Sequence, residues 1–330
     1  MSTISPAHPK AVHHNILASI GLLPAAIVVI AVVLAYIEPR FLSGQNLLNV
    51  LRGAALLMIV AVGQMLVLIS RGFDLSVGAV MALASVVSAS TMAALGESLS
   101  PGMTSLLGIL AGLGAGLLVG LCNGFCVAVL RITPFMVTLA TASISGGVAL
   151  LLTNGIPIYG LPKAFIALGR GSWLGLPAAV YAAAIVVALT IYIQRRTALG
   201  VHLYAIGGNP HAARVSGLPV LRAQIGVYVA SSLLAALAAL LLTAQLGSGQ
   251  GSLGEGMALK SIGAAVIAGV SLQGGVGLAH RVAVGALFML LLNNAMDLLR
   301  IESKAQTIVM GLFIVLVVAV DAYRAKGKSA

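Results

Sequence analysis

The chain has 330 residues, of which 60% are hydrophobic and 8% are charged, and its mean hydropathy is +1.11. This composition excludes a soluble globular domain, because such domains carry about 25% charged residues. The formal net charge is +11, but the basic residues lie at the ends of apolar runs and do not cluster with aromatic residues, which argues against nucleic-acid binding. We therefore expect an integral membrane protein in which the basic residues report topology.

Ten apolar segments are candidate membrane spans, since a helix needs about 20 residues to cross a ~30 Å hydrocarbon core. They cover residues 16–37, 48–69, 75–95, 104–130, 134–153, 177–194, 223–244, 258–272, 282–299 and 305–322. The eighth is short and rich in glycine, so we expect it to be broken or to cross the bilayer incompletely. The predicted fold is an all-α polytopic membrane protein with about ten transmembrane helices.

An even number of spans places both termini on the same side of the membrane. If the N-terminus is inside, eleven of the 18 Lys and Arg residues fall inside and seven outside, as the positive-inside rule requires. The expected organisation is a cytoplasmic N-terminal tail (1–15), a transmembrane domain (16–322) that includes the loop 195–222, and a cytoplasmic C-terminal tail (323–330).

The loop 195–222 is the longest polar interruption of the chain, and it contains four arginines and no acidic residue. Asn209 is a favourable residue for a helix N-cap, and Pro210 is favourable at the first helical position. Gly217 is favourable at the position where a helix ends. We expect a basic helix of about two turns from Pro210 to Ser216. A short helix on the cytoplasmic face is suited to docking against a soluble partner, and a simple connector with a local turn is the alternative.

The fourth span carries glycines at a spacing of four, which are Gly108, Gly112, Gly116, Gly120 and Gly124. In lipid, small residues allow helix backbones to approach closely. We therefore interpret the stripe as structural and expect a densely packed helix at the centre of the bundle.

Two pairs of segments indicate an internal repeat. Residues 74–90 and 255–269 each contain an acidic residue, a glycine and Met-Ala-Leu, and residues 129–147 and 298–316 each run from Leu-Arg-Ile into a span. The copies are five spans apart and would have opposite orientations, as in transporters built from inverted repeats. Chance similarity among Ala, Val and Leu is the alternative.

Asp74 is the acidic residue near the cytoplasmic ends of the early spans. A carboxylate there could relay protons or bind a cation, but it also suits the first turn of a helix, and we favour this structural role. Glu255 is interpreted in the same way on the outer side. Neutral polar residues within or beside the spans could bind a polyhydroxylated solute or one another: Gln64, Asn123, Thr138, Thr141, Thr153, Asn154, Asn293 and Asn294.

The sequence lacks the residue patterns of an enzyme or a metal site. We find no Ser-His-Asp order, paired carboxylates or histidine-rich metal spacing in a plausible place. The Gly-Lys-Ser at 327–329 has Ala322 where a phosphate-binding loop has its first glycine. We therefore expect no catalytic residue, no metal and no cofactor in this chain.

Five segments in chain order resemble the motifs of ribose-type sugar ABC importer permeases. They are GFDLSVGAVMAL (72–83), ITPFMVTLAT (132–141), YAIGGNPHAARVSGLPV (204–220), AVIAGVSLQGGVG (265–277) and IVMGLFIVLVVAVDAYR (308–324). The resemblance spans nearly the whole chain. It implies a permease subunit in the bacterial inner membrane that pairs with a second, identical or different, permease subunit. A separate ATPase would bind ATP and magnesium, and a periplasmic sugar-binding protein would deliver the cargo.

The resemblance also implies roles for individual residues. Those assigned to coupling with the ATPase are Gly207, Gly208, Asn209, Pro210, Ala212, Ala213, Arg214, Ser216 and Gly217. Candidates on or near the pathway are Asp74, Leu75, Ser76, Gly78, Pro134, Phe135 and Thr138, together with Asn123. Two positions depart from the family pattern. Arg71 stands where glycine is usual, with an ion pair to Asp74 as one consequence, and Ala268-Gly269 replaces a Gly-Gly pair.

The mechanism that the resemblance implies is alternating access, with the binding protein docking on outer loops such as 155–176. An ion-coupled secondary carrier that uses Asp74 or Glu255 is a different hypothesis; it predicts transport without an ATPase and loss of coupling in Asp74→Asn. An ABC permease for a branched-chain amino acid or a nucleoside is a third. A charged headgroup would need a compensating charge or helix terminus, so the lack of a clear cation in mid-span favours a neutral solute.

Overall fold

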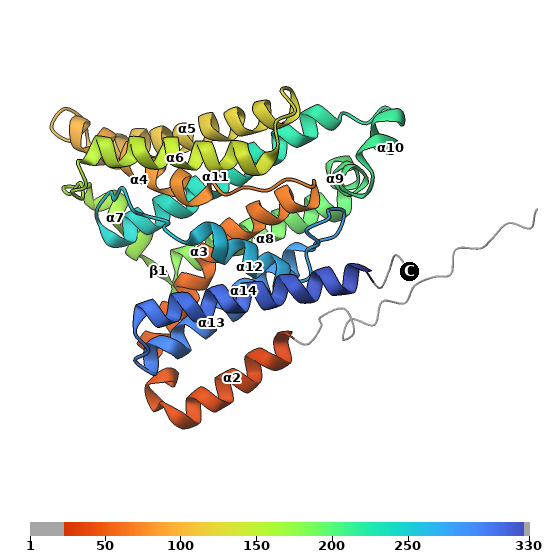
Figure 1. Ribbon diagram of the computed structural model, residues 1–330. Helices are drawn as coiled ribbons and strands as arrows, with labels where there is room; N and C mark the ends of the chain where they lie inside the picture. Colours follow the sequence, from red (N-terminus) through yellow and green to blue (C-terminus); the bar gives the residue numbers. More distant parts are fainter. Residues whose placement is uncertain (1–22, 327–330) are drawn as a thin grey trace, which may run out of the picture.

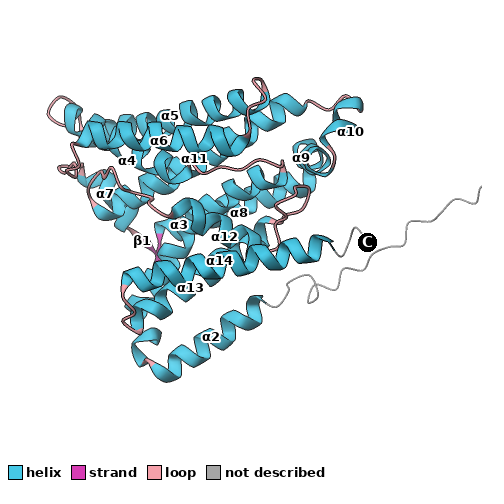
Figure 2. Ribbon diagram, in the orientation of Figure 1, coloured by secondary structure: helices cyan, strands magenta, loops and turns pink. Residues whose placement is uncertain are grey.

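The computed structural model describes residues 23–326 (Figure 1). Almost all of this part is helical, and its only strands form one short hairpin (Figure 2). The elements are α2 (Leu23–Ile37), η1 (Pro39–Leu42), α3 (Gly44–Ile69), α4 (Val77–Leu95), α5 (Pro101–Ala128), α6 (Pro134–Thr153), α7 (Lys163–Arg170), β1 (Ser172–Trp173), β2 (Leu176–Pro177), α8 (Ala178–Arg196), α9 (Ala198–Gly208), α10 (Pro210–Val215), α11 (Val220–Leu246), α12 (Met257–Ile267), α13 (Ala279–Leu298) and α14 (Ser303–Lys326). The predicted tail 1–15, the start of the first span (16–22) and residues 327–330 lie outside the described residues.

Each of the ten predicted spans corresponds to a helix in the described part of the chain. Seven helices there are long and apolar enough to cross a membrane, namely α3, α4, α5, α6, α8, α11 and α13. Helix α12 has only 11 residues, a rise of ~16 Å, which is about half of the hydrocarbon thickness. The expectation that the eighth span is broken or crosses the bilayer incompletely is therefore confirmed, since the helix is too short to cross it. The connecting helices α7 and α9 and the hairpin were not predicted.

Helix α3, and not the glycine-striped α5, lies at the centre of the bundle. Nearly every side chain of α3 from Ala54 to Ile69 is buried, because α8, α11, α12 and α13 all pack around it. In α5 the glycine face is tightly packed, but leucines on the other face, such as Leu110 and Leu118, are exposed. The prediction of close packing is correct, and the prediction of a central position is wrong.

The glycine face of α5 leaves no room for side chains where it meets its neighbours. A Cβ on Gly108 would clash with Met92 of α4, and a Cβ on Gly120 would lie 2.8 Å from the Cα atom of Val229 in α11. By contrast, nothing lies within 4 Å of a Cβ added to Gly114. The stripe thus brings the backbones of α4, α5 and α11 together without intervening side chains.

We expect Gly120→Ala to destabilise the protein by about 1–3 kcal/mol, because backbone atoms must move to admit the methyl group. Gly114→Ala is the matched control, and it should be neutral or slightly stabilising, since alanine is the better helix former. The midpoint of heat-induced unfolding of the purified protein in detergent measures both. Equal midpoints for the two variants would contradict the packing described here.

Two non-helical segments enter the bundle and lead into helices. Residues 70–76 turn back from the end of α3, and Asp74 and Ser76 in this segment are completely buried. Residues 247–256 follow α11 and run along α4. Near the start of this segment a Cβ on Gly249 would meet Ala89, and near its end the carbonyl oxygen of Gly254 lies against Gly78. Helices α4 and α12 therefore begin inside the bundle.

The arrangement of α3–α6 is repeated by α11–α14, as the sequence repeat predicts. Three contacts in the first half have counterparts in the second. The contact of α5 with α11 corresponds to that of α13 with α3, and the contact of α4 with α6 corresponds to that of α12 with α14. The contact of α4 with α11 corresponds to that of α12 with α3. The Leu-Arg-Ile segments match as well, since Arg131 (φ 56°) and Arg300 (φ 55°) both adopt the left-handed conformation after a helix. Gly78 and Gly254, which touch each other, each precede a Met-Ala-Leu by three residues. The structure thus supports the repeat.

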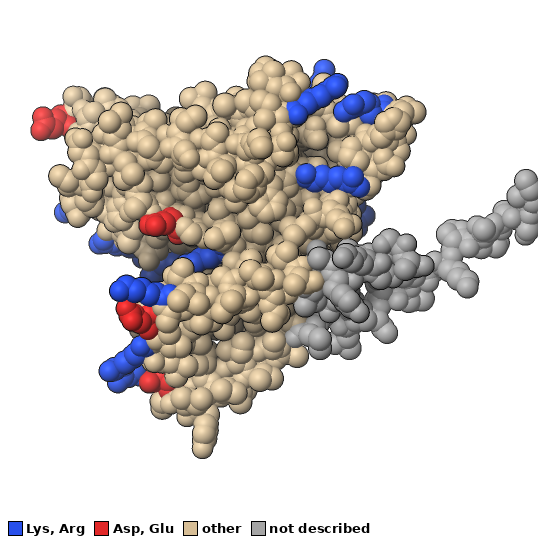
Figure 3. Space-filling view, viewed as in Figure 1, with Lys and Arg blue, Asp and Glu red and all other residues tan. Residues whose placement is uncertain are grey.

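Charged side chains gather at two opposite ends of the molecule, with an uncharged band between them (Figure 3). Among the charged side chains of the described residues, this view shows Lys and Arg at the end that carries α10, and the acidic side chains lie toward the end that carries α7. We refer to these as the α10 end and the α7 end. The uncharged band is the part that suits a lipid bilayer.

Candidate functional site

A buried polar network surrounds Asp74 at the start of α4. Its Oδ1 atom accepts hydrogen bonds from the Ser76 backbone N–H (2.9 Å) and hydroxyl (2.6 Å), and its Oδ2 atom accepts one from the Ser231 hydroxyl (2.9 Å). Asn123 Nδ2 donates to Ser76 Oγ (2.9 Å), and the Thr141 hydroxyl donates to Asn123 Oδ1 (2.7 Å). Because α5, α6 and α11 each contribute one member, the network fixes the N-terminus of α4 to three other helices.

The predicted pathway residues do not all lie together. Asp74, Ser76 and Asn123 form the network, and Thr138 is nearby, with its hydroxyl 3.3 Å from the carbonyl oxygen of Phe73. Gly78 packs on Gly254, and Pro134 is the first residue of α6. Phe135 is 51% exposed, and Leu75 is half-buried. Ser231 was not predicted as a partner of Asp74, although the Ser231-Ser232 pair inside an apolar helix was a usable signal.

Arg71 does not form the predicted ion pair with Asp74. Its guanidinium points to α9, where Nε donates to the carbonyl oxygen of Gly207 and Nη2 to that of Gly208, both at 2.7 Å. The pairing fails because Arg71 has a φ of 64°, which directs the chain back into the bundle and leaves the side chain outside. The left-handed conformation also explains why glycine suits this position.

The helix predicted after Asn209 is present as α10 (Pro210–Val215). Asn209 Oδ1 accepts hydrogen bonds from the backbone N–H groups of His211 (3.1 Å) and Ala212 (3.0 Å), as an N-cap should. Gly217 has a φ of 78°, which is the left-handed conformation of a helix stop. The helix signal in the sequence is therefore confirmed.

The residues assigned to coupling divide into an exposed and a buried group. The exposed or half-buried ones are Gly208, Asn209, Pro210, Ala212, Arg214, Ser216 and Gly217. Ala213 is buried beside Ile206 and Val220, and Gly207 is buried against the carbonyl oxygen of Ile69. A partner that docks on α10 cannot touch these two. It would instead meet Val215, which is 77% exposed and was not predicted.

The loop between α12 and α13 is bound to the end of α3 and to α9. The backbone N–H of Gly275 donates to the carbonyl oxygen of Ile69 (2.9 Å), and the hydroxyl of Tyr204 donates to the carbonyl oxygen of Gly277. Burial raises the pKa of the Tyr204 hydroxyl, which further favours the protonated form that donates this hydrogen bond. Helix α9 is thus held against the bundle, and α10 follows directly from it.

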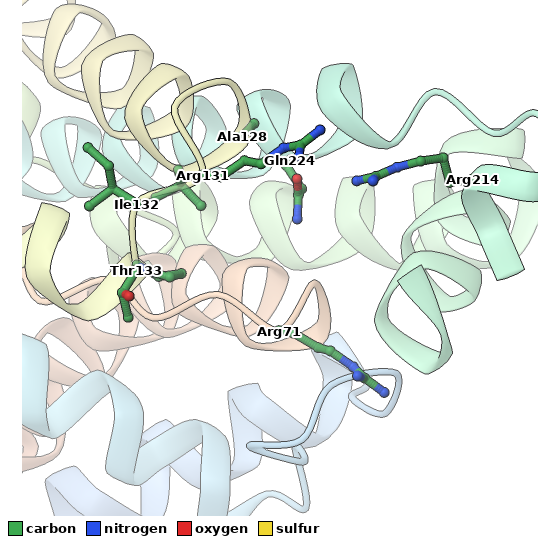
Figure 4. A pocket seen from close by; sticks show the side chains of 9 residues that line it. Arg71, Ala128, Arg131, Ile132, Thr133, Arg214 and Gln224 are labelled. Carbon is green, nitrogen blue, oxygen red and sulfur yellow. The ribbon is translucent and has the colours of Figure 1, made fainter. Parts of the chain in front are cut away.

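A basic pocket of about 390 Å³ lies at the α10 end, between α10 and the ends of α5 and α11. Arg131 and Arg214 point toward Gln224 from opposite sides, whereas Arg71 points away toward α9 (Figure 4). The remaining lining residues are Val127, Ala128, Ile132, Thr133 and Pro134, so the pocket has no acidic residue in its lining. The α10 end therefore presents a short exposed helix beside a positively charged hollow.

Comparison with known proteins identifies the family. A family model described as "Branched-chain amino acid transport system / permease component" matches residues 46–318. The chain belongs to this family. It is 37% identical to the ribose import permease protein RbsC of Bacillus subtilis over 89% of both chains. It is also 37% identical to the L-arabinose transport system permease protein AraH of Escherichia coli, over 91% of this chain and 89% of the relative. No solved structure matches the chain.

The family places the chain among membrane permeases, in agreement with the sequence resemblance. The match covers both halves of the structural repeat and the α9–α10 segment. The chain is thus a multi-pass inner-membrane protein that transports and does not catalyse a reaction.

Proposed function

We propose that this chain is the membrane subunit of a binding-protein-dependent importer that moves a monosaccharide or a similar small polyol into the cytoplasm. A separate ATPase, which binds ATP and magnesium, drives the transport, and no cofactor binds this chain. The observation that carries the proposal is the exposed, capped helix α10 beside the basic pocket. A second permease subunit, of the same or another sequence, completes the membrane pathway.

The α10 end faces the cytoplasm in this proposal. The view in Figure 3 supports this orientation, because the charged side chains drawn at that end for the described residues are Lys and Arg, as the positive-inside rule expects. Both termini then lie in the cytoplasm. The α7 end, with the loop 155–176 and its exposed Trp173 and Tyr159, faces the periplasm and receives the binding protein.

The ATPase docks on the exposed face of α10. Val215 provides an exposed apolar contact, and Arg214 and Arg131 provide positive charge for acidic groups on the ATPase. Ala213 and Gly207 serve a different purpose in this proposal, since they pack α10 and α9 against the bundle so that movement of the ATPase moves the spans. Transport then follows alternating access, in which the pathway opens to one side at a time.

A neutral sugar is the cargo that the observations favour. Two of the relatives are named for ribose and arabinose, although the family description names branched-chain amino acids. The polar groups buried in the described spans are mostly hydroxyls and amides, which suit hydrogen bonding to a polyol. An amino-acid headgroup would need a compensating charge or a helix terminus.

Uptake into liposomes tests the proposal. The permease is reconstituted with its ATPase and binding protein, and entry of labelled D-ribose or L-arabinose is measured. We expect uptake to require ATP, magnesium and the binding protein, and to persist when an ionophore collapses the proton gradient. Uptake by the permease alone, driven by a proton gradient, would contradict the proposal and support the ion-coupled carrier. ATP-driven uptake of leucine or a nucleoside instead would retain the importer and change its cargo.

A further inference from the structure

We propose that Arg71 is a positioning residue that transmits movement of α10 to the N-terminus of α4. This inference rests on the proposed function, because it assumes that an ATPase moves α10. In place of the expected ion pair with Asp74, Arg71 forms two hydrogen bonds with α9. These bonds connect α10, through Arg71, to the buried network.

The first step is the attachment of Arg71 to α9. The guanidinium donates two hydrogen bonds of 2.7 Å, to the carbonyl oxygens of Gly207 and Gly208. These are the last two residues of α9, where carbonyl groups lack helical partners and a cation is favoured. The next residue is Asn209, the N-cap of α10. Arg71 therefore holds the hinge between α9 and α10.

The second step is the tight packing of the backbone around this attachment. A Cβ on Gly207 would overlap the carbonyl oxygen of Ile69, and a Cβ on Gly274 would lie 2.4 Å from Cγ of Arg71. Gly275 is also hydrogen-bonded to Ile69. The end of α3, the end of α9 and the loop 269–277 are thus in direct backbone contact. A shift of α9 must displace Arg71 or break its two hydrogen bonds.

The third step is the short path from Arg71 to α4. Residues 72–76 have no regular secondary structure, and Asp74 and Ser76 anchor their far end to α5, α6 and α11 through the buried network. Helix α4 begins at the next residue, Val77. Its Gly78 touches Gly254, which precedes α12. A displacement of Arg71 therefore reaches the place where the two repeats meet.

The conformation of Arg71 supplies a variant that separates transmission from folding. A φ of 64° is strained for arginine but readily adopted by glycine. Arg71→Gly removes both hydrogen bonds and keeps a backbone that fits the turn, so the protein should fold. Arg71→Lys retains a cation that can reach one carbonyl group. Arg300→Gly is the matched control, because Arg300 has nearly the same φ of 55° but follows α13, away from α10.

Hydrogen–deuterium exchange tests the inference in lipid nanodiscs that contain the permease, with and without its ATPase and ATP. In the wild type we expect the ATP-bound ATPase to slow exchange in residues 205–217 and to change exchange in residues 72–80. In Arg71→Gly we expect the effect on exchange in residues 205–217 to remain. The change in exchange of residues 72–80 should fall at least about fivefold, because the hydrogen bonds that connect these residues to α9 are absent. Arg71→Lys should give an intermediate change in exchange of residues 72–80, and Arg300→Gly should give the same change as the wild type.

Three results would overturn the inference. An unchanged response of residues 72–80 in Arg71→Gly would show that movement reaches α4 by another route. Loss of the ATPase effect on residues 205–217 in that variant would make Arg71 a docking residue instead of a transmitting one. If the wild type itself shows no effect on 205–217, the proposed docking on α10 fails, and the role of Arg71 fails with it. The wild-type arm thus separates failure of the proposed function from failure of this inference.

Discussion

Replacing Asp74 with alanine is expected to lower the thermal unfolding midpoint of the detergent-purified permease by about 6–12 °C. The substitution leaves three buried donors, the Ser76 N–H and the hydroxyls of Ser76 and Ser231, without their acceptor. Orphaned donors of this kind cost about 1–3 kcal/mol each, with partial relief as hydroxyls rotate. The loss should reach about 3 kcal/mol in total.

Asp74→Asn keeps the size and one acceptor oxygen of the side chain, and hydroxyl groups can turn to accept from its amide. We expect it to lose less than half as much stability as the alanine variant and to retain ATP-driven uptake. Ser143→Ala is the control, because Ser143 is exposed and bonds only to a carbonyl of its own helix in the described structure. If Asp74→Ala and Ser143→Ala unfold at the same temperature, the network does not stabilise the fold. If Asp74→Asn abolishes uptake while folding normally, Asp74 acts in ion coupling.

Val215→Asp is expected to reduce the amount of ATPase that co-purifies with the permease at least tenfold. Val215 is 77% exposed on α10, so the charge is compatible with folding of the free permease. In a complex the carboxylate would be buried without a partner, and central interface residues commonly contribute 2 kcal/mol or more, or about 30-fold in affinity.

Leu99→Asp is the matched control for Val215→Asp, since Leu99 is also an exposed apolar residue but precedes α5, at the opposite end of that helix from the basic pocket. It should retain the ATPase. Asn209→Asp should retain it as well, because aspartate caps a helix as well as asparagine does. Ala213→Asp is unsuitable as a test of docking, because Ala213 is buried and a charge there would disrupt α10 itself. Retention of the ATPase by Val215→Asp would move the docking surface away from this helix face.

Much of the fold follows from local patterns in the sequence. The spans are long apolar segments, and a bilayer requires such segments to satisfy their own backbone hydrogen bonds as helices. The N-cap at Asn209 and the stop at Gly217 depend only on nearby residues, so α10 was predictable to within a residue. The glycine stripe of α5 predicted close packing, but the position of α5 in the bundle depends on contacts that are distant in the sequence.

The site was less predictable because its contacts join distant segments. Asp74 and Ser231 are separated by 157 positions, and Arg71 and Gly207 by 136. The charges of Arg71 and Asp74 suggested an ion pair, but the left-handed backbone at Arg71 sends the two side chains in different directions. That conformation is favoured by glycine, so the glycine usual at this position in the family was the signal of it, whereas the arginine itself gave none.

The most direct test of the account is purification of the wild-type permease from its native host in mild detergent, followed by mass spectrometry of the proteins that accompany it. We predict an ATPase subunit, recovered with the wild type and lost with Val215→Asp, and a periplasmic binding protein whose bound ligand identifies the cargo. Purification without an ATPase in several detergents, from cells that take up the cargo by means of a proton gradient, would contradict it.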